Sequence, residues 1–316
     1  MRRCLRLGGL AATVWLIVAG AAQAEPLRIS YFTWVGYGPL FVAQEKGFFA
    51  KEGVEVELIN IDDHTAAFAG LFAGQVDAIL GATQDVLTFS EPDEDPLECL
   101  LPLADSRGGD GILANKDIRT IADLKGKSVA FLEGSISEFY LNVLLKEVVD
   151  LSPDDAAEAF MLQEVDAAVT YDPALTRAKN TAHGHLLTDT SERPGLLGDC
   201  LMAKADVFDE RKEDFRAVAR AWAAAVDYAK AHPEEANAIM ARSLGGWLED
   251  PAVFAEIMKG VGLYDAKTSR DYLGTPEAPG PIYDTMQYGI DVMSSLGRLK
   301  VQVTPADLIA HGIFDE

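Results

Sequence analysis

The chain has 316 residues, of which 49% are hydrophobic and 24% charged, and its 50 Asp and Glu against 27 Lys and Arg give a formal charge of -23. This is the composition of a globular protein, and the chain is long enough for two hydrophobic cores. Because the net charge repels phosphate backbones and no basic stripe offsets it, we expect no nucleic-acid partner, and anionic membrane surfaces are disfavoured on the same grounds.

The first 24 residues have the pattern of a cleavable secretory signal. Three arginines among the first six residues precede a mostly apolar stretch over residues 10–19, and Ala22-Gln23-Ala24 forms a small-x-small cleavage site before Glu25. An uncleaved membrane anchor is the alternative, but the apolar stretch is short for a bilayer span. We therefore expect a periplasmic protein that, once the signal is removed, does not insert into a membrane.

The chain after this signal first alternates strand and helix patterns. The predicted order is strand 27–32, a helix from residue 38, strand 54–59, helix 63–73 and strand 77–80. Pro39 near the start of the first helix and Gly74 after the second are residues preferred at those helix ends. A strand–helix–strand–helix–strand unit implies a parallel sheet covered by helices.

A second unit of the same kind follows, and the rest of the chain is mostly helical. Its predicted elements are a strand ending at 113–116, strand 128–132, helix 136–149, a helix at 156–161 and strand 165–170. Ser135 and Glu138 fit a capping box at the first of these helices. The later predicted helices cover 214–232, 233–244, 251–260, 281–296 and 305–310, and the last four of them begin at proline.

No motif for catalysis, a cofactor or a metal accompanies these elements. We therefore expect a protein that is not an enzyme and that binds no cofactor and no metal ion. A catalytic triad assembled in space would leave no such motif. Cys4 leaves with the signal, and Cys99 and Cys200 remain. The two thiols could pair in an oxidising compartment, but we favour two separate buried side chains, because the sequence does not place them close together.

Several segments carry a family resemblance in the same chain order. They are residues 29–34, 39–49, 52–56, 73–78, 105–112, 121–127, 165–173 and 303–305. Together they resemble the substrate-binding proteins of ABC transporters in the superfamily that takes sulfonates, nitrate, taurine and thiamine precursors. The resemblance implies that a small polar metabolite is captured and handed to the permease subunits of an importer by a protein that we expect to be a monomer.

The fold implied by the resemblance is the α/β, two-lobed periplasmic binding protein fold of type II. Each lobe is expected to be a mostly parallel sheet flanked by helices. The implied boundaries are lobe one at 25–106 and 203–316, lobe two at 107–202, and hinges near 105–110 and 198–202. One departure from the family pattern is that no β-patterned segment separates the helix ending near Val149 from the helix beginning near Ala156. Either lobe two lacks one strand, or its helices pair differently.

Candidate ligand-binding residues follow the predicted strands, because ligands bind at the carboxyl ends of strands in such sheets. They are Thr33, Trp34, Tyr37, Asp63, His64, Gln84 and Asp85 in lobe one, Asp105, Arg107 and Asp110 at the hinge, and Glu133, Ser135, Ser137, Tyr171 and Asp172 in lobe two. Simpler roles compete with ligand contact. Trp34 could pack on Phe41, Asp63 and Asp85 could cap helices, and Asp105 could pair with Arg107.

The candidates disagree about the charge of the ligand. The helix start at 133–137 favours an anion, whereas the aromatic and acidic candidates favour a cation, and Arg107 is the only fixed positive charge among them. We therefore favour an amine-bearing or N-heterocyclic metabolite, such as a thiamine-precursor pyrimidine, over a taurine-like or sulfonate ligand. Two other classes of protein function stay open. One is an enzyme of the thiamine-pyrimidine synthase type, whose Cys-rich motif is missing here, and the other is a ligand sensor that feeds no importer.

Overall fold

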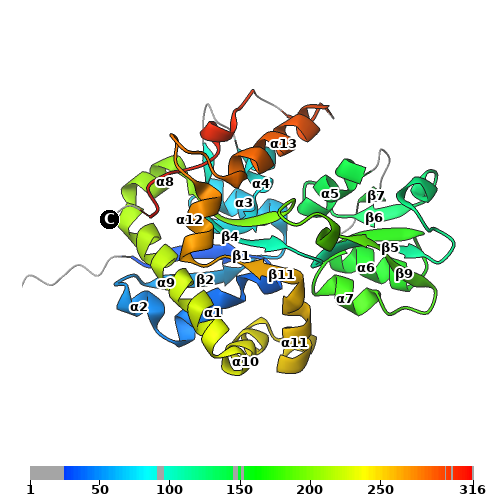
Figure 1. The fold of residues 1–316 in the computed structure, drawn as a ribbon, viewed down its shortest axis with the longest axis horizontal. Coiled ribbons are helices and arrows are strands. Elements are labelled where there is room, and N and C mark those ends of the chain that lie inside the picture. Colours follow the sequence, from blue (N-terminus) through cyan, green and yellow to red (C-terminus); the bar gives the residue numbers. More distant parts are fainter. Residues whose placement is uncertain are drawn as a thin grey trace, which may run out of the picture.

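The computed structural model describes residues 25–90, 96–144, 149–150, 153–295, 297–299 and 302–314. The predicted signal at 1–24 lies outside the described residues. Two α/β lobes lie side by side (Figure 1), one built on a six-stranded sheet in the order β11-β4-β10-β3-β1-β2 and the other on a five-stranded sheet in the order β7-β6-β8-β5-β9. We call the first sheet with its helices lobe one and the second lobe two.

The strands are β1 (Leu27–Tyr31), β2 (Val56–Asn60), β3 (Ala78–Ala82), β4 (Leu97–Ser106), β5 (Asp110–Asn115), β6 (Val129–Phe131), β7 (Val149–Asp150), β8 (Ala167–Tyr171), β9 (Gly184–Asp189), β10 (Gly198–Lys204) and β11 (Val261–Leu263). The helices of lobe one are α1 (Gly38–Glu45), α2 (Phe48–Lys51), α3 (His64–Phe72), α4 (Asp85–Phe89), α8 (Ala205–Glu210), α9 (Lys212–Ala231), α10 (Pro233–Leu244), α11 (Pro251–Ile257), α12 (Ala266–Leu273) and α13 (Pro281–Ser295). Those of lobe two are α5 (Ile136–Leu144), α6 (Pro153–Met161) and α7 (Ala174–Ala178).

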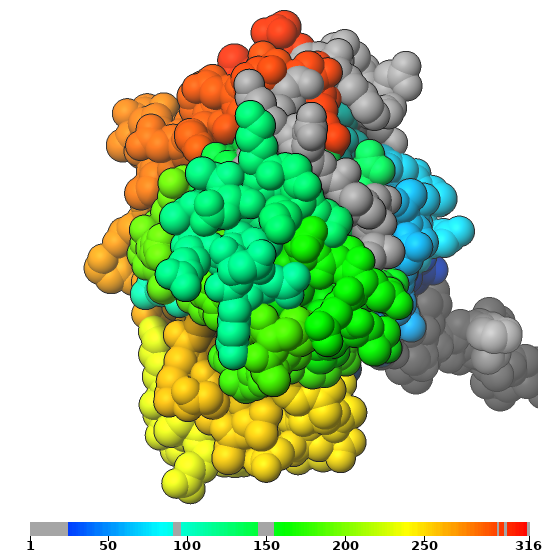
Figure 2. Space-filling model, turned by 90° about the vertical axis from the view of Figure 1, so that its right-hand side faces the viewer, coloured from blue at the N-terminus to red at the C-terminus, as the bar shows by residue number. Residues whose placement is uncertain are grey.

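Helices cover both faces of each sheet. In Figure 1, α1, α2, α9 and α10 lie below the sheet of lobe one and α3, α4, α12 and α13 lie above it, while α5 lies above the sheet of lobe two and α6 and α7 lie below. Figure 2 views lobe two end-on, with its green surface between the orange and red C-terminal helices and the yellow α10 and α11. No helix in the described ranges has both the length and the apolar character required to cross a bilayer.

Both sheets are mixed, which corrects the expectation of mostly parallel sheets. β1 pairs in parallel with β2 and β3, and β6 does so with β7 and β8, as the two predicted units require. The remaining pairs, which involve β4, β5, β9, β10 and β11, are antiparallel. The physical reason is the path of the chain: β4 leads out of lobe one and β10 leads back into it, so the two strands run in opposite directions.

Lobe two does not lack the strand whose absence was predicted. The helix predicted to reach Val149 is described as far as Leu144, and β7 pairs Val149 and Asp150 with Ala130 and Phe131 of β6. A strand of two residues is too short to show an alternating pattern, which is why the sequence did not reveal it. The prediction of an α-helix at 305–310 is also wrong, because this segment contains only a 3-10 turn, at Pro305–Asp307.

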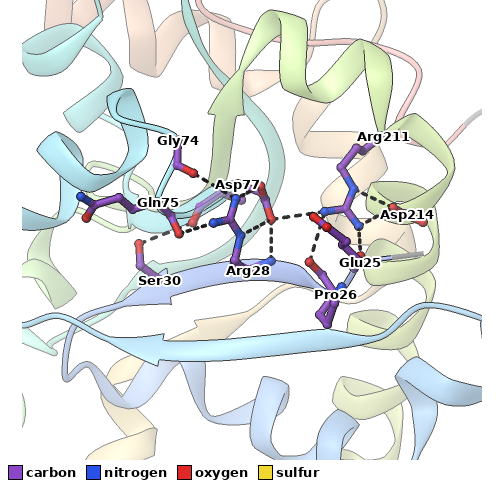
Figure 3. A network of polar contacts seen from close by, with 10 residues as sticks. Glu25, Pro26, Arg28, Ser30, Gly74, Gln75, Asp77, Arg211 and Asp214 are labelled. Atoms are coloured by element: carbon purple, nitrogen blue, oxygen red, sulfur yellow. Dashed lines mark hydrogen bonds and ion pairs between the residues drawn. The ribbon is translucent and has the colours of Figure 1, made fainter. Parts of the chain in front are cut away.

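An aspartate that precedes the last parallel strand of each lobe fixes the neighbouring strand. In lobe one, Asp77 accepts hydrogen bonds from the backbone amide of Arg28 at 2.8 Å and from its guanidinium, and Arg211 on the other side lies 3.2 Å away (Figure 3). In lobe two, Asp166 accepts from the amide of Ser128 at 3.0 Å. The Val-Asp-Ala sequence that occurs before both strands therefore has a structural role.

We expect Asp77→Ala to lower the free energy of unfolding by about 2 kcal/mol at neutral pH, because it leaves the guanidinium of Arg28 without its carboxylate and leaves Arg211 with Asp214 alone. Burial alone would raise the pKa of Asp77, but hydrogen bonds from Arg28 outweigh it and hold this pKa below its ordinary value. The stabilisation is therefore present above pH 3.8 and lost as the pH falls through the folded-state pKa. Urea unfolding of wild-type protein and of Asp77→Ala at pH 7 and pH 3 measures the difference in the free energy of unfolding.

The control for this prediction is Asp271→Ala, which removes an exposed carboxylate from an ion pair with Lys267 one helical turn away. Exposed pairs of this kind contribute about 0.5 kcal/mol or less. Equal losses in the two variants would show that the network around Asp77 contributes no more than an ordinary surface pair.

Cys99 and Cys200 form a disulfide, which corrects the interpretation of two separate thiols. Their Cα atoms are 5.7 Å apart, within the usual range for a disulfide. The pairing follows from topology, since Cys99 lies on β4 and Cys200 on the adjacent β10. The bond closes a loop that contains every described element of lobe two.

Candidate functional site

Three neighbouring cavities lie where the loops after β1, β2 and β3 face the loops after β6 and β8. The α5 cavity has a volume of about 480 Å³ and is lined by Gln84, Asp85, Thr88, Phe89, Glu133, Gly134, Ser135, Glu138, Phe139, Asn142, Met293 and Arg298. The α3 cavity, of about 550 Å³, is lined by Asp62, Asp63, His64, Thr65, Thr88, Phe89, Leu132, Glu133 and Gly134. The hinge cavity, of about 20 Å³, is lined by Phe32, Trp34, Ala82, Ser106, Asp110, Ile136, Tyr171, Leu197, Gly198 and Asp199.

The hinge cavity is almost filled by aromatic side chains from the two lobes. The rings of Trp34 and Tyr171 meet edge-on with their centroids 5.8 Å apart, and Phe32 lies 6.1 Å from Tyr171. A space of about 20 Å³ holds about one water molecule. A ligand can therefore lie between Trp34 and Tyr171 only if the lobes move apart, whereas the two larger cavities have the size of small-molecule sites.

Trp34 is held by Asp199, which the sequence analysis missed. The indole Nε1 donates a 2.8 Å hydrogen bond to Oδ2 of Asp199, and the hydroxyl of Tyr37 lies 3.4 Å from Oδ1 of the same carboxylate. Phe41, considered as the packing partner of Trp34, instead lies against Tyr31. Asp199 lies on β10, where the chain returns to lobe one, and no sequence motif marked it.

Two glycines leave the space that the indole fills. A Cβ atom on Gly36 would lie 2.3 Å from Nε1 of Trp34, and one on Gly109 would lie 2.6 Å from its Cη2. Gly36 belongs to the loop after β1, and Gly109 lies in the crossover from β4 to β5. The ring is therefore confined from both sides, and its position depends on the conformation of the crossover.

We expect Gly109→Ala to lower the free energy of unfolding by about 1–3 kcal/mol, because the added methyl group overpacks a confined ring. The control is Gly70→Ala within α3, where a Cβ would meet only Oε1 of Gln75 at 3.6 Å. Alanine is the better helix former, so the control variant should be neutral or slightly stabilised. Thermal unfolding of both variants tests this, and an unchanged Gly109→Ala protein would contradict the proposed confinement of Trp34.

Three carboxyl groups lie at or beside the hinge cavity: Asp110, which is buried, and Asp199, which is partly buried, line it, and the buried Asp85 lines the adjacent α5 cavity. Burial raises the pKa of Asp85 to about 7, and burial together with the charge of Asp172 raises the pKa of Asp110 to about 7. Burial also raises the pKa of Asp199 well above its usual range, and Asp110 and Asp85 add to this effect. Throughout the described ranges, no Lys or Arg forms an ion pair with Asp85, Asp110 or Asp199. This part of the site favours a cation.

The α5 cavity combines unsatisfied and satisfied polar groups. Gln84 is only 4% exposed; its Nε2 donates to the carbonyl of Leu196 at 2.9 Å, and its Oε1 has no partner. Ser135 accepts a bond from the amide of Ser137, as an N-cap does, but Glu138 accepts from the amide of Gly134 rather than that of Ser135. The predicted capping box is thus shifted by one residue on its carboxylate side.

The α3 cavity contains His64, which is buried and packs on Phe32 with ring centroids 4.3 Å apart. Burial lowers the pKa of His64 to about 4, so its imidazole is neutral at neutral pH. Both ring nitrogens lack a hydrogen-bond partner. The neighbouring Asp63 accepts a bond from the amide of Ala66 and caps α3, which is the simpler role that the sequence analysis weighed for it.

Eight of the other predicted residues line a cavity and six line none of the three. Those on the cavities, besides His64, are Trp34, Asp63, Gln84, Asp85, Asp110, Glu133, Ser135 and Tyr171. Those away from them are Thr33, Tyr37, Asp105, Arg107, Ser137 and Asp172. Asp105 pairs with Arg107, and Asp172 accepts from the amide of Thr176 at the start of α7. A role of these residues in binding stays a prediction.

The comparison with known proteins identifies the family. The profile described as NMT1/THI5 like matches residues 34–236, which is more than half of the chain. The chain belongs to the NMT1/THI5-like family. The resemblance to periplasmic substrate-binding proteins of ABC transporters is thereby confirmed at the level of the superfamily.

Relatives of the NMT1/THI5-like chain have the same fold and the names of binding proteins. The alkanesulfonate-binding protein from Xanthomonas axonopodis pv. citri, solved bound to MOPS, is 19% identical, with a TM-score of 0.74 over 92% of this chain and 99% of that one. The periplasmic aliphatic sulphonate binding protein from Escherichia coli is 21% identical, with a TM-score of 0.71 over 90% and 97%. A Brucella abortus protein, named only as a binding protein, is 22% identical over 97% of both chains. These likenesses confirm the periplasmic binding protein fold.

Proposed function

We propose that the protein binds a small solute carrying an ammonium or protonated nitrogen heterocycle between its lobes and delivers it to an ABC importer from the periplasm. Membership of a family of substrate-binding proteins supports the class, and the names of its relatives support binding rather than catalysis. The proposal includes the predicted monomeric state and the permease subunits as partners.

The observation that carries the choice of ligand is the set of carboxyl groups at and beside the hinge cavity, for which the described part of the chain supplies no Lys or Arg partner. The charges of Asp110 and Asp85 each add to the raised pKa of Asp199 in a poorly solvated region, and a positive ligand would relieve that repulsion. The edge-on rings of Trp34 and Tyr171 add an aromatic surface that suits a planar or cationic group once the lobes separate. The unpartnered Oε1 of Gln84 supplies an acceptor for a ligand N–H.

A second candidate class, the sulfonates, is favoured by the relatives and by Arg298 at the edge of the α5 cavity. The two classes are separated by one screen. Purified protein is examined by native mass spectrometry for a retained small molecule and then melted in the presence of amines, aminopyrimidines, alkanesulfonates and nitrate. A ligand that binds only the folded protein raises the melting temperature. Stabilisation by sulfonates or nitrate and by no ammonium compound would contradict the proposed ligand.

A further inference from the structure

The α5 cavity contains an arrangement of anion-binding donors that the chain fills with its own carboxylate. Arg298, which follows α13 in lobe one, forms an ion pair with Glu138 on α5 of lobe two. The other carboxylate oxygen of Glu138 accepts a 2.8 Å hydrogen bond from the backbone amide of Gly134. A guanidinium and an amide at a helix start are donors that suit sulfonates, carboxylates and phosphates. Glu138 therefore occupies the place that an anionic group of a ligand would take.

The described residues offer an anionic ligand little fixed positive charge. Arg298 is the one cationic side chain among the described residues that line the three cavities. The Glu138 side chain is only 5% exposed, and Asp85 and Glu133 line the same cavity. Releasing Glu138 from Arg298 would leave a buried carboxylate beside other acids, which is strongly unfavourable.

An independent observation indicates that the same cavity is built for a ligand. Gln84 is more than nine-tenths buried, lines the α5 cavity and has an Oε1 atom without a hydrogen-bond partner. Buried acceptors are nearly always paired, so this atom calls for a donor from a bound molecule. The cavity thus offers an acceptor to an N–H group while its guanidinium is already taken.

We propose that Glu138 is a specificity-determining residue, which excludes anionic solutes from the α5 cavity by holding Arg298 and the Gly134 amide. The inference rests on the proposed function, because it takes the space between the lobes as the ligand site. It also accounts for a cation preference in a chain whose fold is that of alkanesulfonate-binding proteins.

The test measures binding of ethanesulfonate by isothermal titration calorimetry at pH 7.5 and low salt. Wild-type protein should bind it weakly or not at all, and Glu138→Gln and Glu138→Ala should each bind it at least tenfold more tightly. Adding Arg298→Ala to Glu138→Gln should abolish the gain. Glu158→Gln, which removes the same charge from the exposed face of α6, is the control and should show no gain.

Each outcome bears on the proposal. Wild-type protein that binds ethanesulfonate as tightly as the variants would overturn it, and so would folded variants without a gain. Circular dichroism establishes folding, and Glu138→Gln, which keeps an acceptor for the Gly134 amide, serves if the alanine variant does not fold. Failure of the proposed function is read separately, from wild-type protein that binds none of the ammonium compounds.

Discussion

Replacing both Cys99 and Cys200 by serine should lower the free energy of unfolding by about 5 kcal/mol. The two residues are 101 positions apart, and closing a loop of roughly 100 residues restricts the unfolded chain by about that amount. Both cysteine side chains are fully buried next to each other on β4 and β10, so serine also places hydroxyl groups in an apolar region. Equilibrium unfolding in guanidinium chloride measures the loss.

The contribution of the bond itself is isolated by a control on the wild-type protein. Wild-type protein that is unfolded in reductant and refolded with free thiols should lose most of the same free energy, whereas reductant should not affect the double serine variant. A reduced protein as stable as the oxidised one would show that the covalent link contributes nothing to the stability of the fold.

The affinity for a solute with a fixed positive charge should rise as the pH rises through 7. Asp85 and Asp110 each have a pKa of about 7, so both are mostly protonated at pH 5.5 and mostly ionised at pH 8. If one of them must be ionised for binding, the affinity increases about thirtyfold over this interval. A trimethylammonium compound is the suitable probe, because its own charge does not change with pH.

Stability without ligand should change in the opposite direction. The pKa of each of these two groups is raised from 3.8 on folding, so the folded state binds more protons than the unfolded state between about pH 4 and pH 7. Their contribution to the free energy of unfolding therefore falls as the pH rises through that interval. Asp110→Asn should flatten both profiles, and an affinity independent of pH in wild-type protein would contradict a binding role of these carboxylates.

The sequence predicted those parts of the fold that depend on local patterns. The units β1-α1-β2-α3-β3 and β6-α5-β8 were found because their strands stand out as alternating or short apolar runs between helix start and stop residues, and α10 begins and ends where its proline and apolar spacing predicted. β7 was missed because two residues have no period. The antiparallel strands were missed in part because their pairing depends on how the chain crosses between lobes.

The candidate site was predictable where it follows a strand and unpredictable where it depends on tertiary pairing. Trp34, Asp110 and Tyr171 come together because each lies at a strand end or at the hinge. Asp199 becomes a partner of Trp34 only through the position of β10 in the sheet, and Arg298 reaches Glu138 only because the segment after α13 lies over α5. Neither contact leaves a trace in sequence spacing.

The pairing of β4 with β10 has a consequence for how this architecture can change. Gly198 lies opposite Asp105, and the amide of Ser106 donates to the carbonyl of Leu197 at 2.9 Å. The chain thus leaves the six-stranded sheet and re-enters it at adjacent points, so a tight turn from Ser106 to Gly198 would make a plain β-hairpin. The residues between them are topologically an insertion between two paired strands. Such an insertion can be lengthened, shortened or replaced by another domain while the six-stranded sheet keeps its register.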